Sequence, residues 1–291
     1  MPFLKKIANK FINPPVKKIL SINFFWKLCT PVLFFSKYLT HQRNLVFTED
    51  EKKKNELLAR NMFQNLVVKN GSFRGMKYPE FQAIWSTLYS KLLGSYECEL
   101  NNIIENCCRE NYTQIIDVGC AEGYYAVGFA MRVKKAHVFA CDINEKALEQ
   151  CEKMAKLNGV SDRISYEKKC NPEMLSNFKF DGKGLLIIDC EGYEYELLSD
   201  KKVCEKLKNC DIIIELHDYT KNYIIENNFR NTHQFFFIES VDDFQKAKKY
   251  QYKELDSLGF YEKKYILEER RQNIMEWIFI KSNYQTDGMI Q

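Results

Sequence analysis

From residue 114 onward, the sequence alternates short apolar runs with amphipathic segments of helical length. Seven runs have the length and the β-branched or aromatic content of strands. They cover residues 114–118, 136–142, 163–168, 184–189, 211–216, 234–239 and 276–281. Helical stretches follow the first five, an order typical of a parallel sheet with helices on both faces. With 45% hydrophobic residues among 291, the chain can bury one substantial core.

The first of these runs ends in a glycine turn, "QIIDVGCAEGYYAVGFA", at residues 114–130. In an open parallel sheet, ligands bind beyond the carboxyl ends of the strands, where such a turn leads into a helix. Gly119 and Gly123 would allow the main chain to approach a ligand closely, and the N-terminus of the following helix attracts anions. The turn is therefore expected to hold a carboxylate or a phosphate.

The glycine spacing distinguishes between ligands. A dinucleotide fold uses G-x-G-x-x-G, whereas this chain has D-x-G-x-x-x-G at Asp117, Gly119 and Gly123. That pattern resembles the first motif of class I S-adenosylmethionine (SAM)-dependent methyltransferases. The resemblance implies that Asp117 serves the methionine ammonium and the helix N-terminus its carboxylate. Asp142, which ends the next strand, would accept hydrogen bonds from the ribose hydroxyls, while Glu97 is either a cofactor contact or a solvated acid at a helix start.

Two later segments narrow the resemblance to one type of class I methyltransferase. The stretches "LLIIDCEGYEYELL" at 185–198 and "DIIIELHD" at 211–218 look like the D-x-E-G-x-E and E-x-H signatures of FkbM-type methyltransferases. The matching residues are Asp189, Glu191, Gly192, Glu194, Glu215 and His217. With "GSYE" upstream, the resemblance covers roughly residues 70–240. It implies a Rossmann-like, seven-stranded, mostly parallel sheet with an antiparallel last strand, and O-methylation of a glycan or another small molecule.

His217 is the histidine that the sequence places at the carboxyl end of a strand. His137 and His233 begin strands and are expected at the opposite edge of the sheet. An alcohol is a poor nucleophile until it loses its proton, and an imidazole has an ordinary pKa near neutrality. We therefore expect His217 to act as the general base, with Asp189 and Glu191 orienting it or the acceptor. A divalent ion held by these carboxylates is the competing mechanism, which we do not favour from the sequence.

The first 48 residues differ in composition from the remainder. Eight lysines and arginines occur there with no acid before Glu49, so the net charge of +4 conceals a basic N-terminus and a mildly acidic body. An acidic body argues against a nucleic-acid groove. The run "ILSINFFWKLCTPVLFFSKYL" at 19–39 mixes cations with aromatic residues, as interfacial anchors on anionic lipid do. The alternatives are a basic helix packed on its own domain and a membrane span interrupted by Lys27 and Pro31.

Eleven cysteines are irregularly spaced, without a C-x-x-C pair or a secretory leader, which favours a reducing compartment over a disulfide framework. We therefore expect a cytoplasmic protein, peripheral on the inner face of the membrane if its N-terminal segment anchors it. Cys120, Cys141, Cys170 and Cys190 follow four strands whose spacing of about 4.8 Å spreads them too widely for one zinc ion. Small side chains that line a cofactor pocket explain them better.

The expected organisation has four parts. Residues 1–48 form the basic segment, residues 49–113 a helical lead-in, residues 114–281 the methyltransferase domain and residues 282–291 a tail.

Three helices are expected in the lead-in. Thr48 has the features of an N-cap, so the first should begin there. The second follows Pro79 and is stopped by Gly94, and the third carries an apolar face over residues 100–108.

Each candidate residue also has a structural explanation. Asp117 could cap the turn and Asp142 the next helix. Asp189, Glu191 and Glu194 could simply suit a helix N-terminus, and His217 could be a structural histidine with satisfied hydrogen bonds. Arg270 and Arg271 are expected to form a solvated charge cluster, the alternative being a site for an anionic acceptor. A NAD-dependent oxidoreductase would share the fold but needs the other glycine spacing, and a membrane-attached scaffold could keep the fold without catalysis.

Overall fold

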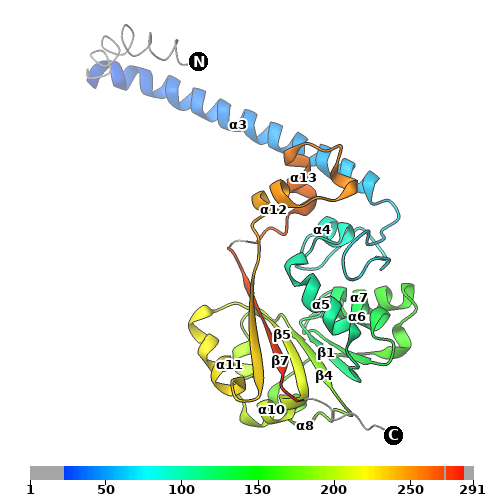
Figure 1. The fold of residues 1–291 in the computed structure, drawn as a ribbon. Helices are drawn as coiled ribbons and strands as arrows, with labels where there is room; N and C mark the ends of the chain where they lie inside the picture. Colours follow the sequence, from blue (N-terminus) through cyan, green and yellow to red (C-terminus); the bar gives the residue numbers. More distant parts are fainter. Residues whose placement is uncertain (1–22, 272, 285–291) are drawn as a thin grey trace. The chain divides into compact units, whose positions relative to one another are not determined.

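The computed structural model describes residues 23–271 and 273–284. The chain divides into two compact units, Met1–Leu58 and Ala59–Gln291. The described part of the first unit is a long helix, and the second unit contains the sheet predicted from the sequence (Figure 1).

Helix α3 runs without interruption from Asn23 to Met62. The expectation that a helix begins at Thr48 is therefore wrong. Residues 32–47 contain neither glycine nor proline, so a helix formed upstream propagates through Thr48 at little cost. No helix among the described residues is long and apolar enough to cross a membrane. Residues 1–22 of the expected anchor lie outside the described part of the chain.

Seven strands form one sheet in the order β3-β2-β1-β4-β5-β7-β6. They are β1 (Gln114–Val118), β2 (His137–Cys141), β3 (Ile164–Glu167), β4 (Gly184–Ile188), β5 (Cys210–Leu216), β6 (His233–Glu239) and β7 (Glu276–Ser282). Neighbouring strands are parallel except that β7 is antiparallel to both β5 and β6. The Rossmann-like, mostly parallel sheet is therefore confirmed, together with all seven predicted strands.

Helices cover both faces of the sheet (Figure 1). One side carries α5 (Asn101–Arg109), α6 (Tyr124–Arg132) and α7 (Glu145–Leu157). The other carries α8 (Pro172–Asn177), α10 (Lys201–Lys206) and α11 (Asn222–Phe229). Every residue of β4 and β5 is buried, which explains the apolar residues that dominate both strands. The two buried acids of β5, Asp211 and Glu215, pair with Lys183 and Arg271.

An insertion between β6 and β7 adds two helices to this layered fold. They are α12 (Asp243–Lys249) and α13 (Phe260–Leu267), and α13 contacts α4 (Leu88–Leu93) of the lead-in. Figure 1 shows these three helices together, beyond one edge of the sheet. The segment that returns from α13 to β7 passes close to the end of β5, as its ion pairs described below show.

The lead-in is only partly as predicted. The helix expected after Pro79 begins at Leu88, although it ends at Gly94 as expected. In the intervening segment, the Ile84 N–H donates to Glu122 Oε2 at 3.0 Å and Trp85 has a φ of 58°, so tertiary contacts replace helical hydrogen bonds. The third expected helix is confirmed as α5, which buries Ile104 on its apolar face.

Candidate functional site

The parallel strands end together, which brings the predicted site residues to one edge of the sheet. Val118 at the end of β1 pairs with Cys141 of β2 and Ile188 of β4, and Ile188 pairs with Ile214 of β5. Asp117, Gly119, Gly123 and Asp142 make up what we call the β1–β2 side. Asp189, Glu191, Glu215 and His217 make up the β4–β5 side.

Both glycines of the turn are required by contacts within the protein. Gly119 has a φ of 85°, and a Cβ atom there would lie 1.7 Å from the carbonyl oxygen of Asp189. Gly123 has a φ of 98°, and a Cβ atom there would lie 2.6 Å from Sγ of Cys151. The sequence analysis attributed these glycines to the approach of a ligand. Their first effect is to let the turn pack against the end of β4 and against α7.

Most main-chain donors of the turn are used inside the protein. The N–H groups of Gly119 and Cys120 donate to the carbonyl of Cys141, and Gly123 donates to the carbonyl of Cys120. The Ala121 N–H donates to the Asp142 carboxylate at 2.9 Å. A ligand carboxylate at this place would therefore be bound by N–H groups in the first turn of α6.

Asp117 is the buried acid of the β1–β2 side. Its side chain is 2% exposed, and Oδ2 has no hydrogen-bond partner within the described part of the chain. Burial, opposed by a main-chain hydrogen bond from Ala126 and reinforced by the charge of Asp142, raises the pKa of this carboxyl to about 7. A buried acceptor atom of this kind suits a positively charged N–H group.

Asp142 supports the glycine turn from the end of β2. Its two carboxylate oxygens accept the N–H groups of Ala121, at 2.9 Å, and Asn144, at 2.8 Å. The N-cap of α7 is Asn144, so the alternative that Asp142 caps this helix is wrong. The carboxylate is half-buried, with Ile143 exposed beside it.

Glu97 is a buried member of the site, not a solvated acid. It is 2% exposed and has a φ of 47°. Its carboxylate accepts a hydrogen bond from the Tyr125 hydroxyl and pairs with Arg271 at 2.6 Å. Burial is the main cause that raises its pKa, to about 7.

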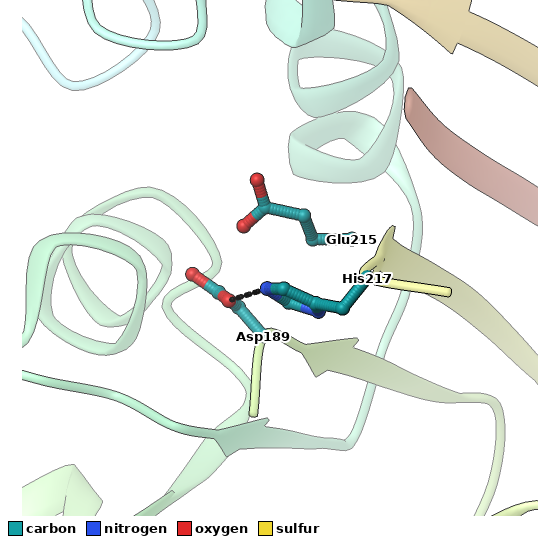
Figure 2. Close-up of side chains that lie close together, drawn as sticks. All are labelled: Asp189, Glu215 and His217. Carbon is teal, nitrogen blue, oxygen red and sulfur yellow. Dashed lines mark ion pairs between the residues drawn. The ribbon is translucent and has the colours of Figure 1, made fainter. Parts of the chain in front are cut away.

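The β4–β5 side brings two acids and an imidazole together (Figure 2). Donor atoms of Asp189, Glu215 and His217 all lie within 4.8 Å of one another. His217 Nε2 is 3.6 Å from Asp189 Oδ1 and 3.7 Å from Glu191 Oε2. Glu191, with a φ of 54°, is 85% exposed, whereas Glu215 is buried. The sequence analysis predicted this proximity from strand order, since β5 lies next to β4.

The orientation of the His217 ring is set by Glu194, which is fully buried at the start of the short helix α9 (Glu194–Leu197). Glu194 Oε1 is 3.1 Å from Nδ1 and accepts the His217 main-chain N–H at 3.2 Å. Its other oxygen accepts the Gly192 N–H at 2.9 Å. Because a carboxylate can only accept, Nδ1 carries the proton toward Glu194, and Nε2 faces Asp189 and Glu191.

A family profile described as "Methyltransferase domain" matches residues 109–254, which is half of the chain. The chain belongs to this methyltransferase family. It is a class I SAM-dependent methyltransferase, with SAM as the cofactor that this fold implies. No curated protein matches it by sequence.

Solved structures similar to this methyltransferase include three from other organisms. One is the precorrin-8w decarboxylase of Methanobacterium thermoautotrophicum, with 16% identity over 63% of this chain and 89% of that chain and a TM-score of 0.42. A SAM-dependent O-methyltransferase of Thermotoga maritima has 13% identity over 62% of each chain, with a TM-score of 0.39. The precorrin-6y C5,15-methyltransferase of Geobacter metallireducens has 12% identity over 64% and 88%, with a TM-score of 0.44.

The protonation of the β4–β5 side of the methyltransferase differs from the sequence expectation. Burial lowers the pKa of His217, but the hydrogen bond and charge of Glu194 and the charges of Glu215 and Asp189 outweigh it and raise the pKa to about 9. Burial and the charge of Asp189 also raise the pKa of Glu215, to about 8. At neutral pH the imidazole is therefore protonated on both nitrogens, and Nε2 must lose its proton before His217 can act as a base.

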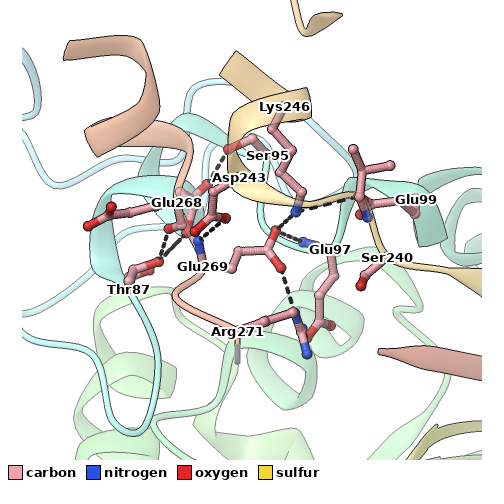
Figure 3. Close-up of polar contacts among 12 residues, drawn as sticks. Thr87, Ser95, Glu97, Glu99, Ser240, Asp243, Lys246, Glu268, Glu269 and Arg271 are labelled. Carbon is pink, nitrogen blue, oxygen red and sulfur yellow. Dashed lines mark hydrogen bonds and ion pairs between the residues drawn. The ribbon is translucent and has the colours of Figure 1, made fainter. Parts of the chain in front are cut away.

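Arg271 is the site residue that the sequence analysis misjudged. It was expected in a solvated cluster, but its side chain is 16% exposed and pairs with Glu215 and Glu97. It also pairs with Glu269 at 2.9 Å (Figure 3). Lys246 pairs with Glu269 from α12, as Figure 3 also shows. Arg271 lies outside the segment that resembles a known family, and only its place just before the strand beside β5 could have indicated its role.

The expectation for Arg270 is closer to the structure. Its side chain is 57% exposed, and its Nε donates to Glu268 at 2.7 Å. Two consecutive arginines therefore have opposite environments, one at the surface and one in the site.

The row of cysteines at the strand ends does not form a metal group. Cys120, Cys141 and Cys170 are buried, and Cys190 is half-buried. Among the described residues, the group of three or more side chains able to hold a metal is Asp189, Glu215 and His217, without a cysteine. Cys141 and Cys170 belong to the hydrophobic core, and Cys190 packs against it.

Proposed function

We propose that this methyltransferase moves the methyl group of SAM to a hydroxyl oxygen of a glycan or another small molecule, as its resemblance to FkbM-type enzymes implies. One observation carries the proposal. His217 Nε2 faces Asp189 and Glu191 at the β4–β5 side, while Glu194 contacts Nδ1, the other ring nitrogen. A hydroxyl placed against this group would meet fixed polar atoms next to the side where the donor binds.

The β1–β2 side supports the binding of the donor. In the proposal, the buried Oδ2 of Asp117 accepts the methionine ammonium, and the turn at Gly119 and Gly123 positions α6 for the methionine carboxylate. Asp142 accepts the ribose hydroxyls with lone pairs that its two main-chain bonds leave available. Glu97 contributes negative charge beside the donor, which is a cation.

The chemistry that remains for the protein is modest, because the sulfonium already activates the methyl group. The protein must align donor and acceptor, exclude water and favour loss of the acceptor proton. His217, Asp189 and Glu191 are the catalytic residues of the proposal: they orient the hydroxyl and favour its ionised form. As the oxygen–carbon bond forms, the carbon–sulfur bond breaks, S-adenosylhomocysteine leaves, and one proton is released.

Calorimetry and a transfer assay test this function. The protein should bind S-adenosylhomocysteine and not NAD, and radiolabelled SAM should methylate hydroxyl acceptors drawn from sugars and small alcohols. Binding of NAD without S-adenosylhomocysteine would point to an oxidoreductase. Transfer to amines alone would contradict the choice of oxygen, and cofactor binding without transfer to any acceptor would favour a scaffold.

We also propose that the N-terminal segment attaches the enzyme to an anionic membrane surface. The described part of α3 exposes Val32, Phe34, Phe35, Tyr38 and Leu39, and the sequence around them is basic. Apolar side chains among cations suit the interface between lipid headgroups and acyl chains. The full chain should therefore sediment with anionic liposomes and be released as salt increases.

Substitutions in α3 supply the control for membrane binding. Phe34→Ser with Phe35→Ser should weaken sedimentation, while Trp85→Ser, at an exposed aromatic residue of the second unit, should not. Equal sedimentation with neutral and anionic vesicles would contradict the role of charge, and carbonate-resistant insertion would favour a span.

A further inference from the structure

The group formed by Asp189, Glu215 and His217 has a chemistry that methyl transfer alone does not require. Asp189 follows β4 and His217 follows β5, two strands paired from Gly184 and Cys210 onward. Glu215 lies within β5 itself. Their donor atoms converge to within 4.8 Å of one another on a rigid part of the sheet (Figure 2).

The distances around His217 Nε2 are slightly longer than those between two ligands of one ion. Its separations of 3.6 Å from Asp189 and 3.7 Å from Glu191 exceed an N–H···O hydrogen bond, which spans about 2.7–3.2 Å. Two ligand atoms each about 2.1 Å from one cation, at angles near those of a tetrahedron or an octahedron, lie roughly 3.0–3.5 Å apart. These donor atoms would therefore have to move only slightly closer together to bind a cation.

The hydrogen bond at the other ring nitrogen is independent support. Glu194 is 0% exposed, lies 3.1 Å from Nδ1 and also binds the main-chain N–H groups of His217 and Gly192. A histidine that ligates a metal usually donates its second ring N–H to a carboxylate, which fixes the tautomer and directs the free lone pair at the ion. Glu194 holds His217 in this arrangement.

The local charge also favours a cation. Arg271 is shared among Glu97, Glu215 and Glu269, and Lys246 also pairs with Glu269, so two cations face three buried carboxylates. Asp189 and the exposed Glu191 add two more carboxylates on the open side.

We propose that Asp189, Glu215 and His217 Nε2 bind a divalent cation, with Glu191 as a further oxygen ligand on the open side. Two carboxylates and one imidazole suit manganese or another first-row ion better than magnesium, which prefers oxygen ligands alone. The inference rests on the proposed function and deepens it. The acceptor oxygen would complete the coordination, and its proton would pass to solvent, so that the cation takes the part that the sequence analysis gave to His217 as a base.

Manganese binding to the full chain tests the proposal directly. The protein is first stripped with EDTA, and binding of Mn²⁺ is followed by calorimetry and by the paramagnetic resonance signal of the free ion. One ion should bind, and Asp189→Asn and His217→Ala should each weaken binding by at least about tenfold. Glu194→Gln weakens the contact that orients the His217 ring, so it should weaken Mn²⁺ binding by about 10- to 100-fold. The matched control is Glu196→Gln, an exposed acid of the same helix, which should leave binding unchanged.

Binding of S-adenosylhomocysteine to the stripped protein separates this inference from the proposed function. It also shows that each variant is folded. If the stripped protein binds S-adenosylhomocysteine but no Mn²⁺ at submillimolar concentration, the cation site is wrong and the methyltransferase assignment stands. Mn²⁺ binding that Asp189→Asn and His217→Ala leave intact would also overturn the site. Failure to bind S-adenosylhomocysteine would count against the proposed function instead.

Discussion

The two sides of the site are built in different ways. The β1–β2 side comes from one strand–turn–helix–strand segment, in which Asp117, Gly119, Gly123 and Asp142 follow one another closely. The β4–β5 side draws its polar atoms from segments far apart in the chain. Asp189, Glu215 and His217 come from neighbouring strands, and Arg271, which pairs with Glu215, lies before the last strand. Arg271 also pairs with Glu97, which precedes α5.

In the proposed function, this difference separates binding from chemistry. The β1–β2 side is held by hydrogen bonds within its own segment, such as those that the Gly119 and Ala121 N–H groups donate to Cys141 and Asp142. The β4–β5 side depends on charged side chains from the insertion and the lead-in. Changes at one side should therefore affect cofactor affinity, and changes at the other should affect turnover or stability.

The largest effect is expected from Arg271→Met. Loss of the guanidinium leaves Glu97, Glu215 and Glu269 buried without their shared partner, which should lower the free energy of unfolding by about 3 kcal/mol. Denaturant unfolding measures the change. Arg270→Met is the matched control, since the exposed neighbour should contribute less than about 1 kcal/mol. Equal effects of the two substitutions would show that the β4–β5 side does not depend on this network.

His217→Ala should lower turnover by about 10²-fold or more, because the acceptor hydroxyl loses the group that favours its ionised form. Affinity for S-adenosylhomocysteine should stay within a few-fold of wild type. His137→Ala, at the opposite edge of the sheet, should leave both quantities unchanged. Turnover of the His217 variant close to that of wild type would remove this residue from the catalytic group.

Asp142→Ala should weaken binding of S-adenosylhomocysteine by roughly 2 to 3 kcal/mol, because two charge-assisted hydrogen bonds to the ribose are lost. Part of the change would come from the turn, since Ala121 loses its acceptor. Glu191→Gln, an exposed acid of the β4–β5 side, should leave this affinity unchanged. Calorimetry on both variants shows whether the two sides are as separate as the hydrogen bonds indicate.

Asp117 should make cofactor binding depend on pH. Its pKa is raised to about 7 in the free protein, and binding an ammonium requires the ionised form, so cofactor binding should release a proton below that pH. Affinity for S-adenosylhomocysteine should therefore rise by up to about tenfold per pH unit from about pH 5 and level off near pH 7. Asp117→Asn should abolish the dependence. A dependence that persists in this variant would assign the proton to another group.

The same contrast explains what could be predicted from the sequence. The strands and the glycine turn are local patterns of period and spacing, so their positions could be read residue by residue. Proximity of His217 to Asp189 followed from strand order alone. The environment of Arg271 could not be predicted, because whether an arginine is solvated depends on which acids the fold brings to it. Thr48 failed for a related reason: a capping motif marks a helix start only where the preceding chain is not already helical.

The contact between Gly119 and the carbonyl of Asp189 has a consequence for altering this enzyme. Main-chain atoms of the turn and of β4 meet there with no room for a side chain, so the spacing between the two sides is set by backbone alone. Side chains of the acceptor site can then be exchanged without changing the separation over which the methyl group must travel. A new acceptor specificity should be reachable by substitution at positions around the acceptor other than the proposed catalytic residues, provided that residue 119 remains glycine.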